Sequence, residues 1–416
     1  MTPREERGLI IAAMFKVTKR DGFWIVPSQT GADKKYVVDL EHEKCSCPDH
    51  QETGFVCKHI FAVRFTLKRE VGADGTVTET RTMTFAEKKV YTQNWPAYNL
   101  AQTEEKHRFK TLLHDLCQGI PEPAPKNTGR PPVPLADRLF ATTYKVYSTV
   151  SSRRFACDLD DAHKDGYMSQ PIHCNKVNTF LENKDLTAPL NTLIAQSSLP
   201  LKAVETQFAA DATGFSTGRH VRWHDEKYGV ERSGRDWVKV HAAVGTKTHI
   251  ITAVAIYGRH TNECPIFPEL VRATNRNFSP KEWSADKEYL SVENIETAFA
   301  SDATPYIAFK SNSTGGVGGL FEKMYHLYSL NKDEYMNHYH RRSNVESVFS
   351  AVKRLFGDYI RSRTDTAMKN ESLAKCLAYN ITSVIHSQCE LGIEPVFWPE
   401  KNKQENPAIL PLVRQG

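Results

Sequence analysis

Four side chains in the segment 339–353, YHRRSNVESVFSAVK, have the chemistry of a catalytic or binding surface: Tyr339, Arg342, Glu346 and Lys353. On one continuous helix of about 100° per residue, they fall within a sector of roughly 60°. Apolar residues fall on a different face of the same helix, whose centre lies roughly 130° away, namely Val345, Val348, Val352 and Leu355. The segment therefore predicts one helix with an apolar back against a core and a front that presents a carboxylate, two cations and a phenol.

Two explanations fit this front. A Glu between an Arg and a Lys is commonly a solvated face with weak surface ion pairs. Alternatively, Glu346 binds a metal ion, and Arg342 and Lys353 clamp phosphates by charge-assisted hydrogen bonds. Tyr339 would then hydrogen-bond a phosphate or pack against a sugar or base. The second explanation is favoured because isolated aspartates end two strand-like segments elsewhere in the chain.

The two aspartates are Asp211, which ends the run VETQFAAD, and Asp286, which ends KEWSAD. Either one alone could be a turn residue or a surface charge. Brought together with Glu346, they would repel one another unless a divalent cation neutralised them, and oxygen ligands favour Mg²⁺ or Mn²⁺ over zinc. Two such ions about 4 Å apart would activate a water or a 3′-hydroxyl and stabilise the departing oxygen in an attack on phosphate.

A second metal site is predicted near the N-terminus. Cys45-x-Cys47 is followed, after nine residues, by Cys57-x-His59. Three thiolates and one imidazole make a closed tetrahedral set for one structural Zn²⁺. The alternative explanation is a set of scattered buried cysteines that bind nothing.

The context of this pattern resembles the SWIM zinc finger, in which C-x-C, a spacer and C-x-H accompany a ββα arrangement. The resemblance covers about residues 22–67, where two β-rich runs suggest a hairpin and residues 58–67 suggest a helix. His42 and His50 lie nearby and suit solvated loop positions, although either could serve as an alternate ligand.

The bulk composition fits a folded, multidomain chain. Apolar residues make up 40% of the 416 residues, which is enough for a sizeable core and excludes wholesale disorder. The net charge of +5 is compatible with a nucleic-acid partner without requiring one. The N-terminal residues lack a signal-peptide pattern, and no apolar run is long enough to span a bilayer. Three of the nine cysteines lie between positions 45 and 57, which indicates a metal site and a reducing cytoplasm.

Six parts are expected to position these side chains. In chain order they are a tail at 1–21, a SWIM-type zinc finger at 22–70, a polar segment with a Pro-rich linker at 71–134, a helical region at 135–200, an α/β catalytic domain at 203–365, and a C-terminal helix with a tail at 366–416. In the helical region, Arg153, Arg154 and Lys176 suit a helix-turn-helix-like DNA-binding unit, or equally an ordinary helical subdomain with a charged face.

Strands and helices are expected to alternate in the catalytic part. The strand that ends at Asp211 should be followed by a turn at 213–216, and the runs WVKVHAAVG and HIITAVAIYG should pair as an antiparallel hairpin. His241, on the first of these runs, is expected to be a core or supporting residue rather than a ligand. Beyond Lys353, three arginines extend a possible DNA-binding track, namely Arg354, Arg361 and Arg363.

The order Asp, Asp, Glu on a strand, a strand and a helix resembles an insertion-sequence DDE transposase with a ribonuclease-H-like fold. The signature of its YREK branch, Y-x2-R-x3-E-x6-K, is filled at all four positions, by Tyr339, Arg342, Glu346 and Lys353. DATGFST at 211–217 and ADKEY at 285–289 resemble the segments around that family's two aspartates, with Glu288 where glycine is more common. The resemblance covers about residues 135–365 and implies a mixed sheet flanked by helices.

The resemblance also implies a function. Asp211, Asp286 and Glu346 would be the catalytic residues and the ligands of two Mg²⁺ or Mn²⁺ ions. Tyr339, Arg342 and Lys353 would contact DNA. The expected activity is hydrolysis and transesterification at the ends of an element in double-stranded DNA, by a homodimer that acts in the cytoplasm with the chromosomal DNA.

Two rivals remain open from the sequence. One is a catalytically silent, transposase-derived DNA-binding protein, and the other is an endonuclease that hydrolyses DNA without joining it. The sequence also leaves open whether cut ends pass through a hairpin and whether the zinc finger binds DNA or a protein.

Overall fold

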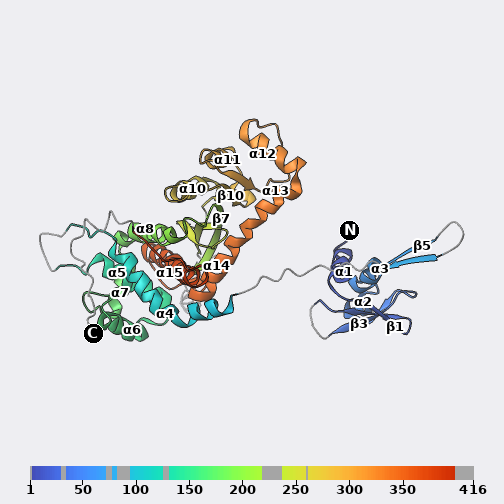
Figure 1. The fold of residues 1–416 in the computed structure, drawn as a ribbon, viewed down its shortest axis with the longest axis horizontal. Coiled ribbons are helices and arrows are strands. Elements are labelled where there is room, and N and C mark those ends of the chain that lie inside the picture. The colour runs from blue at the N-terminus through green and yellow to red at the C-terminus, as the bar shows by residue number, and fades with distance from the viewer. Residues whose placement is uncertain are drawn as a thin grey trace, which may run out of the picture. The chain divides into compact units, whose positions relative to one another are not determined.

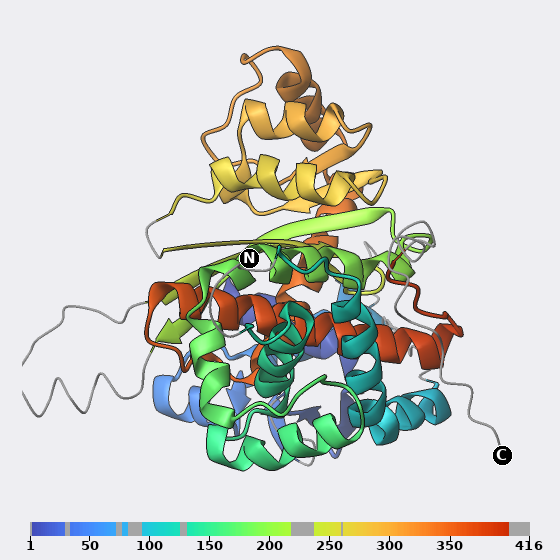
Figure 2. The same cartoon turned by 90° about the vertical axis from the view of Figure 1, so that its left-hand side faces the viewer.

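The computed structural model describes residues 2–29, 34–71, 77–81, 94–124, 131–217, 237–258 and 261–398. The chain divides into two compact units, Met1–Thr92 and Gln93–Gly416 (Figures 1 and 2). The tail predicted at the C-terminus lies outside the described residues from position 399 onward, as does part of the predicted Pro-rich linker, 125–130. No helix in the described ranges is long and apolar enough to cross a lipid bilayer.

The first unit contains a small antiparallel sheet of order β1-β2-β3-β4. Its strands are Thr18–Arg20, Phe23–Pro27, Lys35–Asp39 and Lys44–Cys45. Its helices are α1 (Pro3–Met14), α2 (Pro48–Thr53) and α3 (Lys58–Thr66), and a separate ribbon pairs β5 (Leu67–Val71) with β6 (Val77–Arg81). The predicted hairpin is confirmed, since β2 and β3 pair antiparallel with Trp24 opposite Val38.

Residues 3–14 form helix α1, where the sequence predicts a tail. Thr2 and Glu5 form a capping box at its start, in which each side chain accepts a hydrogen bond from the other residue's backbone N–H. Ile11 is fully buried in the core of this unit. Gly8 permits a close approach of α1 to α3, because a Cβ at this position would lie 2.5 Å from the Cβ of Phe61. Helix α1 is therefore an integral part of the first unit.

The second unit is organised around a mixed sheet of order β11-β10-β7-β8-β9. Its strands are β7 (Gln207–Thr217), β8 (Trp237–Gly245), β9 (Ile251–Gly258), β10 (Glu282–Ala285) and β11 (Thr304–Ile307), and the short β12 (Tyr359–Ile360) pairs with β7. β8 is antiparallel to both β7 and β9, whereas β10 is parallel to both β7 and β11. The pairing confirms the predicted mixed sheet and the predicted hairpin of β8 with β9.

Helices cover both faces of this sheet. In chain order they are α4 (Trp95–Gln118), α5 (Leu135–Ser148), α6 (Ser152–Lys164), α7 (Cys174–Leu181), α8 (Thr187–Ser198), α10 (Phe267–Asn275), α11 (Val292–Phe299), α12 (Gly319–Leu330), α13 (Lys332–Tyr339), α14 (Ser343–Phe356) and α15 (Asp365–Leu391). Short 3₁₀ turns are η1 (Lys184–Leu186), η2 (Leu199–Leu201), η3 (Cys264–Ile266), η4 (Lys287–Tyr289) and η5 (His340–Arg342). One face of the sheet packs against α8, α14 and α15, and the other against α10 and α11.

Strand β7 is longer than the sequence predicts. Residues 213–216, where the sequence predicts a turn, continue the strand and pair with β8, so that Ser216 lies opposite Trp237. The glycine at position 214 is required here by close packing, because a Cβ would lie 2.6 Å from the indole ring of Trp237. Helices cover both faces of the strand, so it lacks the polar alternation that marks a half-exposed strand.

Helix α15 is buried along most of its length and joins the helices to the sheet. The Oδ1 atom of Asn380 accepts the N–H of Ile251 on β9 at 2.9 Å, and its Nδ2 donates to the carbonyl of Ile251 at 2.7 Å. The same Nδ2 donates to Ser197 at the end of α8 at 2.9 Å. The sequence assigns α4, the helices within 135–200 and α15 to three separate parts. In the structure, all of them share one core with the sheet.

Truncating α15 at a buried position should destabilise the second unit. Leu377 is fully buried, so Leu377→Ala leaves a cavity and should lower the free energy of unfolding by about 2–5 kcal/mol. The matched control is Leu355→Ala, because Leu355 is 42% exposed and its truncation should cost less than about 0.5 kcal/mol. Chemical denaturation of the full chain followed by circular dichroism measures both variants, and equal losses would contradict this packing.

Candidate functional site

The four predicted zinc ligands converge in the first unit. Cys45 ends β4, and Cys47 immediately precedes α2. Cys57 immediately precedes α3, and His59 lies in the first turn of that helix. All four side chains are buried, and their ligand atoms lie within 4.8 Å of one another. The Nδ1 atom of His59 faces the thiols, at 3.9 Å from Cys45 Sγ and 3.8 Å from Cys57 Sγ.

The electrostatics of this group favour a bound cation. Hydrogen bonding with Cys45, helped by His59, lowers the pKa of Cys57 to about 3 against the opposing effect of burial. The same hydrogen bond together with burial raises the pKa of Cys45, and burial raises the pKa of Cys47. A second thiolate in this closed space therefore needs a neighbouring positive charge. Three thiolates and one imidazole are the donor set of a structural Zn²⁺ site, so these residues fit the metal.

The two other histidines near this group have different partners. His50 Nδ1 lies 2.8 Å from the backbone carbonyl of Phe55, and His42 Nδ1 lies 2.9 Å from the carboxylate of Asp39. Neither belongs to the set of ligand atoms within 4.8 Å. The Cys3His set is therefore complete without an alternate ligand.

Replacing one thiol should release the zinc. Cys57→Ser removes a ligand that bridges the two halves of the set, so zinc content should fall from about one ion per chain to a small fraction of that value. Residues 22–67 should also lose stability, because binding free energy at such a site is folding free energy. Cys157→Ser is the control, since Cys157 is exposed on α6. Elemental analysis measures both, and full zinc content in Cys57→Ser would reject this ligand set.

The register of the sheet places two of the predicted catalytic carboxylates side by side. β7 and β10 are parallel, with Ala210 opposite Ala285, so Asp211 and Asp286 occupy the next positions along the two chains. Neighbouring strands lie about 4.8 Å apart, which keeps these residues close. Asp286 directly follows β10, as the sequence predicts, whereas Asp211 lies within β7 rather than at its end.

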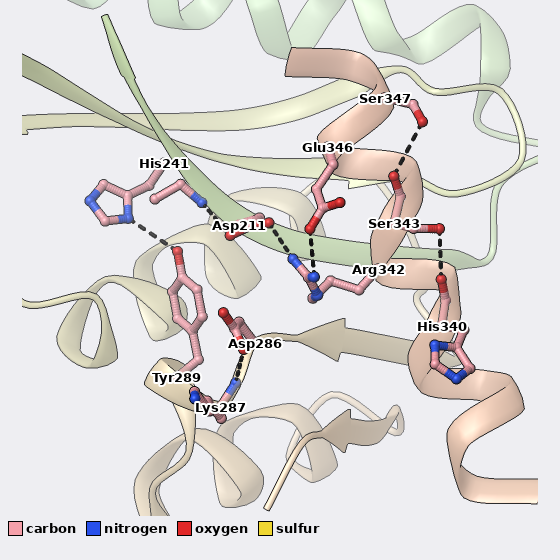
Figure 3. A network of polar contacts seen from close by, with 11 residues as sticks. Asp211, His241, Asp286, Lys287, Tyr289, His340, Arg342, Ser343, Glu346 and Ser347 are labelled. Carbon is pink, nitrogen blue, oxygen red and sulfur yellow. Dashed lines mark hydrogen bonds and ion pairs between the residues drawn. The ribbon is translucent and has the colours of Figure 1, made fainter. Parts of the chain in front are cut away.

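Glu346 approaches the same place from the first turn of α14, which packs on β7 and β8. Figure 3 shows Asp211, Asp286 and Glu346 gathered around the guanidinium of Arg342. Within the described ranges, the Cys/His group of the first unit is the only set of three or more Cys, His, Asp or Glu whose ligand atoms all lie within 4.8 Å of one another. The three carboxylates are therefore gathered but held farther apart than a metal-bound set.

Arg342 is the positive charge at the centre of this arrangement. Its Nη1 lies 2.6 Å from Asp211 Oδ2, and its Nη2 lies 2.5 Å from Glu346 Oε1. The sequence predicts a phosphate-binding role for Arg342, but here its guanidinium pairs with two of the three acids. Burial raises the pKa of Asp211 to about 6, and repulsion from Asp286 and Glu263 adds to this, while the charge of Arg342 opposes it.

Glu263 belongs to this charge cluster, and the sequence gives no sign of it. Its carboxylate pairs with Lys239 Nζ on β8 at 2.6 Å, and its negative charge contributes to the raised pKa of Asp211. Glu263 precedes the short turn η3 in the segment TNECP, which has no periodicity or motif that would have singled it out.

The remaining signature residues flank the carboxylates. Lys353 Nζ donates to Thr213 Oγ1 on β7 at 2.7 Å and lies 5.5 Å from the centre of the Phe215 ring. Burial lowers the pKa of Lys353. The ring of Tyr339 lies 5.9 Å from the guanidinium carbon of Arg342, and burial raises the pKa of its phenol.

The signature segment is not one continuous helix. α13 ends at Tyr339, the 3₁₀ turn η5 spans His340–Arg342, and α14 begins at Ser343. A 3₁₀ turn has about three residues per turn, so it rotates Tyr339 relative to the residues on α14. The predicted apolar back is correct for the three valines, but Leu355 is exposed. The core-facing side of α14 is completed by Phe349 and Phe356 instead.

A buried histidine–tyrosine contact supports the turn after Asp286. His241 on β8 is fully buried, as the sequence predicts, and its Nδ1 lies 3.2 Å from the hydroxyl of Tyr289. Burial lowers the pKa of His241 to about 4, helped by the nearby charge of Lys239, so the imidazole is neutral at pH 7. Tyr289 ends the turn η4 that Asp286 begins (Figure 3). This contact thus anchors the segment that carries the second aspartate.

Two family models match this chain. Residues 202–381 match the transposase DDE domain, and residues 36–66 match the SWIM zinc finger. Residues 202–381 form a transposase DDE domain. The matched region includes the sheet, the three carboxylates and most of α15, and it runs past residue 365, the predicted end of the catalytic domain. The SWIM match contains the whole Cys3His group, which supports a structural Zn²⁺ at these four residues.

The charge of Arg342 should control the protonation of Asp211 in the transposase domain. Arg342→Gln removes the cation that stabilises the charged carboxylate, so the pKa of Asp211 should rise above about 6. Arg341→Gln is the matched control, because Arg341 pairs with Glu282 instead, at 2.6 Å. Carbon NMR titration of aspartate carboxyl groups, assigned with Asp211→Asn, measures the shift without added divalent metal. A pKa that moves equally in both variants would contradict the direct pairing.

Proposed function

We propose that this chain is an active transposase that cuts DNA at the ends of a mobile element and joins them to a target, with Asp211, Asp286 and Glu346 as its catalytic carboxylates. The observation that carries this proposal is the parallel pairing of β7 with β10, which aligns Asp211 with Asp286 beside the first turn of α14. All three residues fall inside the match to the transposase DDE domain.

The donor set supports Mg²⁺ or Mn²⁺ as the metal. All three donors are carboxylates, which select these ions over zinc. Burial chiefly raises the pKa of Asp211 and repulsion from Asp286 adds to it, so a divalent cation at this position would stabilise the charged carboxylate. When bound, two divalent ions at these oxygens would activate the attacking water or 3′-hydroxyl and stabilise the departing oxygen.

The cations of the signature have separate roles in this proposal. Arg342 neutralises Asp211 and Glu346 until a divalent cation takes its place. Its guanidinium, with five N–H donors in a planar fork, then binds phosphate oxygens. Lys353, held against β7 by Thr213, binds a second phosphate. Tyr339, beside Arg342, packs against a sugar or base or hydrogen-bonds a phosphate.

The partner in this proposal is double-stranded DNA, at both the element ends and the target. A homodimer is the expected DNA-bound form, and the cytoplasm with its chromosomal DNA is the expected location. The zinc finger would contribute binding to DNA or to a partner protein. The positive net charge of the chain is consistent with the DNA partner.

One observation favours a second candidate, a catalytically silent DNA-binding protein. The ion pairs of Arg342 already satisfy two of the three carboxylates, as a structural salt bridge would. Cleavage of linear DNA that depends on Mg²⁺ or Mn²⁺ separates the two candidates. Joined strand-transfer products then separate a transposase from an endonuclease that only hydrolyses.

Glu346→Gln should abolish cleavage and leave DNA binding in place. The substitution removes one negative charge and one oxygen ligand with almost no change in volume. We expect the cleavage rate to fall at least about a hundredfold, in line with the usual loss when one preorganised electrostatic group is removed. Glu293→Gln is the control, because Glu293 is exposed on α11.

The measurement is a metal-dependent cleavage time course on linear DNA, with binding followed separately by fluorescence anisotropy. Unchanged cleavage in Glu346→Gln would reject the site. Loss of both binding and cleavage, in a variant whose thermal unfolding matches that of the parent chain, would show that Glu346 contributes to DNA affinity and would reject a purely catalytic role.

A further inference from the structure

A cavity of about 430 Å³ lies at the end of α14 opposite to Glu346. Its wall combines the α5–α6 connection, the end of α7, the segment after α14 and the start of α15. These pieces are far apart in the sequence but belong to one core. The cavity shares no residue with the carboxylate site, so it needs a separate explanation.

Most of the charged side chains in the wall of the cavity are cationic. Four cations line it, namely Lys145, Arg361, Arg363 and Lys375, together with two carboxylates, Glu182 and Glu371. Glu371 is buried and accepts the backbone N–H of Arg361 at 3.0 Å and of Ser362 at 2.8 Å. The carboxylate of Glu371 is therefore hydrogen-bonded to the backbone of the segment that carries the two arginines. The cavity keeps an excess of positive charge.

The two lysines are buried and contribute positive charge to the cavity, but their ammonium groups are already hydrogen-bonded to backbone carbonyls and are not free to bind a ligand directly. Lys375 is 2% exposed and donates to the carbonyls of Phe356, Gly357 and Tyr359 at 2.8–2.9 Å. Lys145 donates to the carbonyl of Val150. Burial lowers the pKa of both lysines to about 8, and Arg361 adds repulsion. An anion in the cavity would relieve this repulsion.

The arginines are placed to make direct contact. Arg361 is exposed, with Nε 3.2 Å from the hydroxyl of Tyr359 and Nη1 3.3 Å from the carbonyl of Val150, so part of its donor fork remains available. Arg363 is exposed and makes no hydrogen bond or ion pair with any residue that the structure describes. The guanidinium of Arg363 and the remaining N–H donors of Arg361, at the mouth of a cationic cavity, favour a phosphate ligand.

The start of α6 adds a second, independent preference for an anion. Ser151 and Ser152, which line the cavity, are the N-cap and first residue of this helix. A helix N-terminus presents backbone N–H groups and a partial positive charge, which acidic residues in the first turn commonly offset. The first turn of α6 has no acidic residue and instead contains Arg153 and Arg154. Apart from the Ser151 cap on the N–H of Arg154, this helix end therefore has no negative side chain in its first turn, and an anion there would be favoured.

We propose that this cavity binds a phosphate group of the DNA backbone. Phe356 at the cavity and Glu346 are ten residues apart on α14, or about 15 Å along the helix axis. That span equals roughly four nucleotides of a duplex, at about 3.4 Å each. Lys353 lies between the two along the axis of this helix, so a duplex that follows α14 reaches from the carboxylate site past Lys353 to the arginines at the mouth of the cavity. The choice of DNA as the source of the phosphate rests on the proposed function, whereas phosphate binding itself does not.

The first experiment measures DNA binding by the full chain against salt concentration, without added divalent metal so that no cleavage is possible. Arg363→Gln should reduce the slope of log K against log salt by about 0.9, the value for one lost phosphate contact. Arg276→Gln is the matched control, since Arg276 is exposed at the end of α10 and outside the cavity. An unchanged slope in Arg363→Gln would overturn the proposal.

A second variant tests the cavity without removing a cation. Ser152→Asp places a carboxylate in the first turn of α6, where the helix dipole favours it, so the fold should be as stable or more stable. The same carboxylate would repel a phosphate. The DNA affinity of this variant should therefore fall, and its slope of log K against log salt should decrease as in Arg363→Gln. A variant that is stable by thermal unfolding and binds DNA like the parent chain would overturn the site.

Inorganic phosphate separates the two possible sources of the ligand. Titration calorimetry with phosphate should show binding to the parent chain that weakens in both variants. Phosphate binding with an unchanged DNA slope would mean that the cavity takes a free anion, and would overturn the DNA proposal. Neither the DNA-binding slope nor the phosphate titration depends on cleavage. A failed cleavage test with Glu346→Gln would therefore leave the phosphate site standing, and a failed phosphate test would leave the catalytic proposal standing.

Discussion

The pairing of strand β7 is the constraint on which the rest of the structure depends. It pairs antiparallel with β8 and parallel with β10, and β12 joins it near its end, so its position is fixed from both sides. Asp211 is held within this strand, and Asp286 is set beside it by the parallel register. Thr213 and Phe215 on the same strand position Lys353. A one-residue slip of β7 would turn these side chains to the opposite face.

Charge balance is the second requirement of the site. Asp211 is held in a buried, acidic neighbourhood, which raises its pKa, and Arg342 supplies the compensating charge. A guanidinium between two carboxylates makes strong, directional hydrogen bonds, but it gives way to a divalent cation only if the cation offsets their loss. Arg342 is therefore at once a stabilising partner of the carboxylates and a competitor for them. Because Arg342 is the last residue of η5, the conformation of this turn sets where its guanidinium meets the carboxylates.

Local patterns predicted much of this molecule. The zinc ligands and the hairpin of β8 with β9 each depend on residues close in sequence, and the structure contains both features. The three carboxylates could be named from strand ends and a helix face, although no local pattern gives the distance between them.

The errors arise where tertiary contacts override local preference. The turn predicted at 213–216 follows from Gly214, but that glycine makes room for the ring of Trp237 and the strand continues. Leu355 is exposed because it lies at the edge of the apolar stripe of α14, roughly 80° around the helix from Val345, while Phe349 and Phe356 fill the other side of that stripe. The ion pair of Arg342 with Asp211 and the cationic cavity each join residues more than a hundred positions apart, so no window of sequence contains them.

The close approach of α1 and α3 at Gly8 limits which residues the sequence of the first unit can have at this position. α3 begins directly after Cys57 and carries His59 in its first turn, so any shift of this helix moves half of the zinc ligand set. Even a single methyl group at position 8 would press on Phe61 and on the backbone of Lys58. Metal retention in this unit therefore depends on a residue that does not belong to the ligand set, and related chains with a bulkier residue there would need α1 to lie farther from α3.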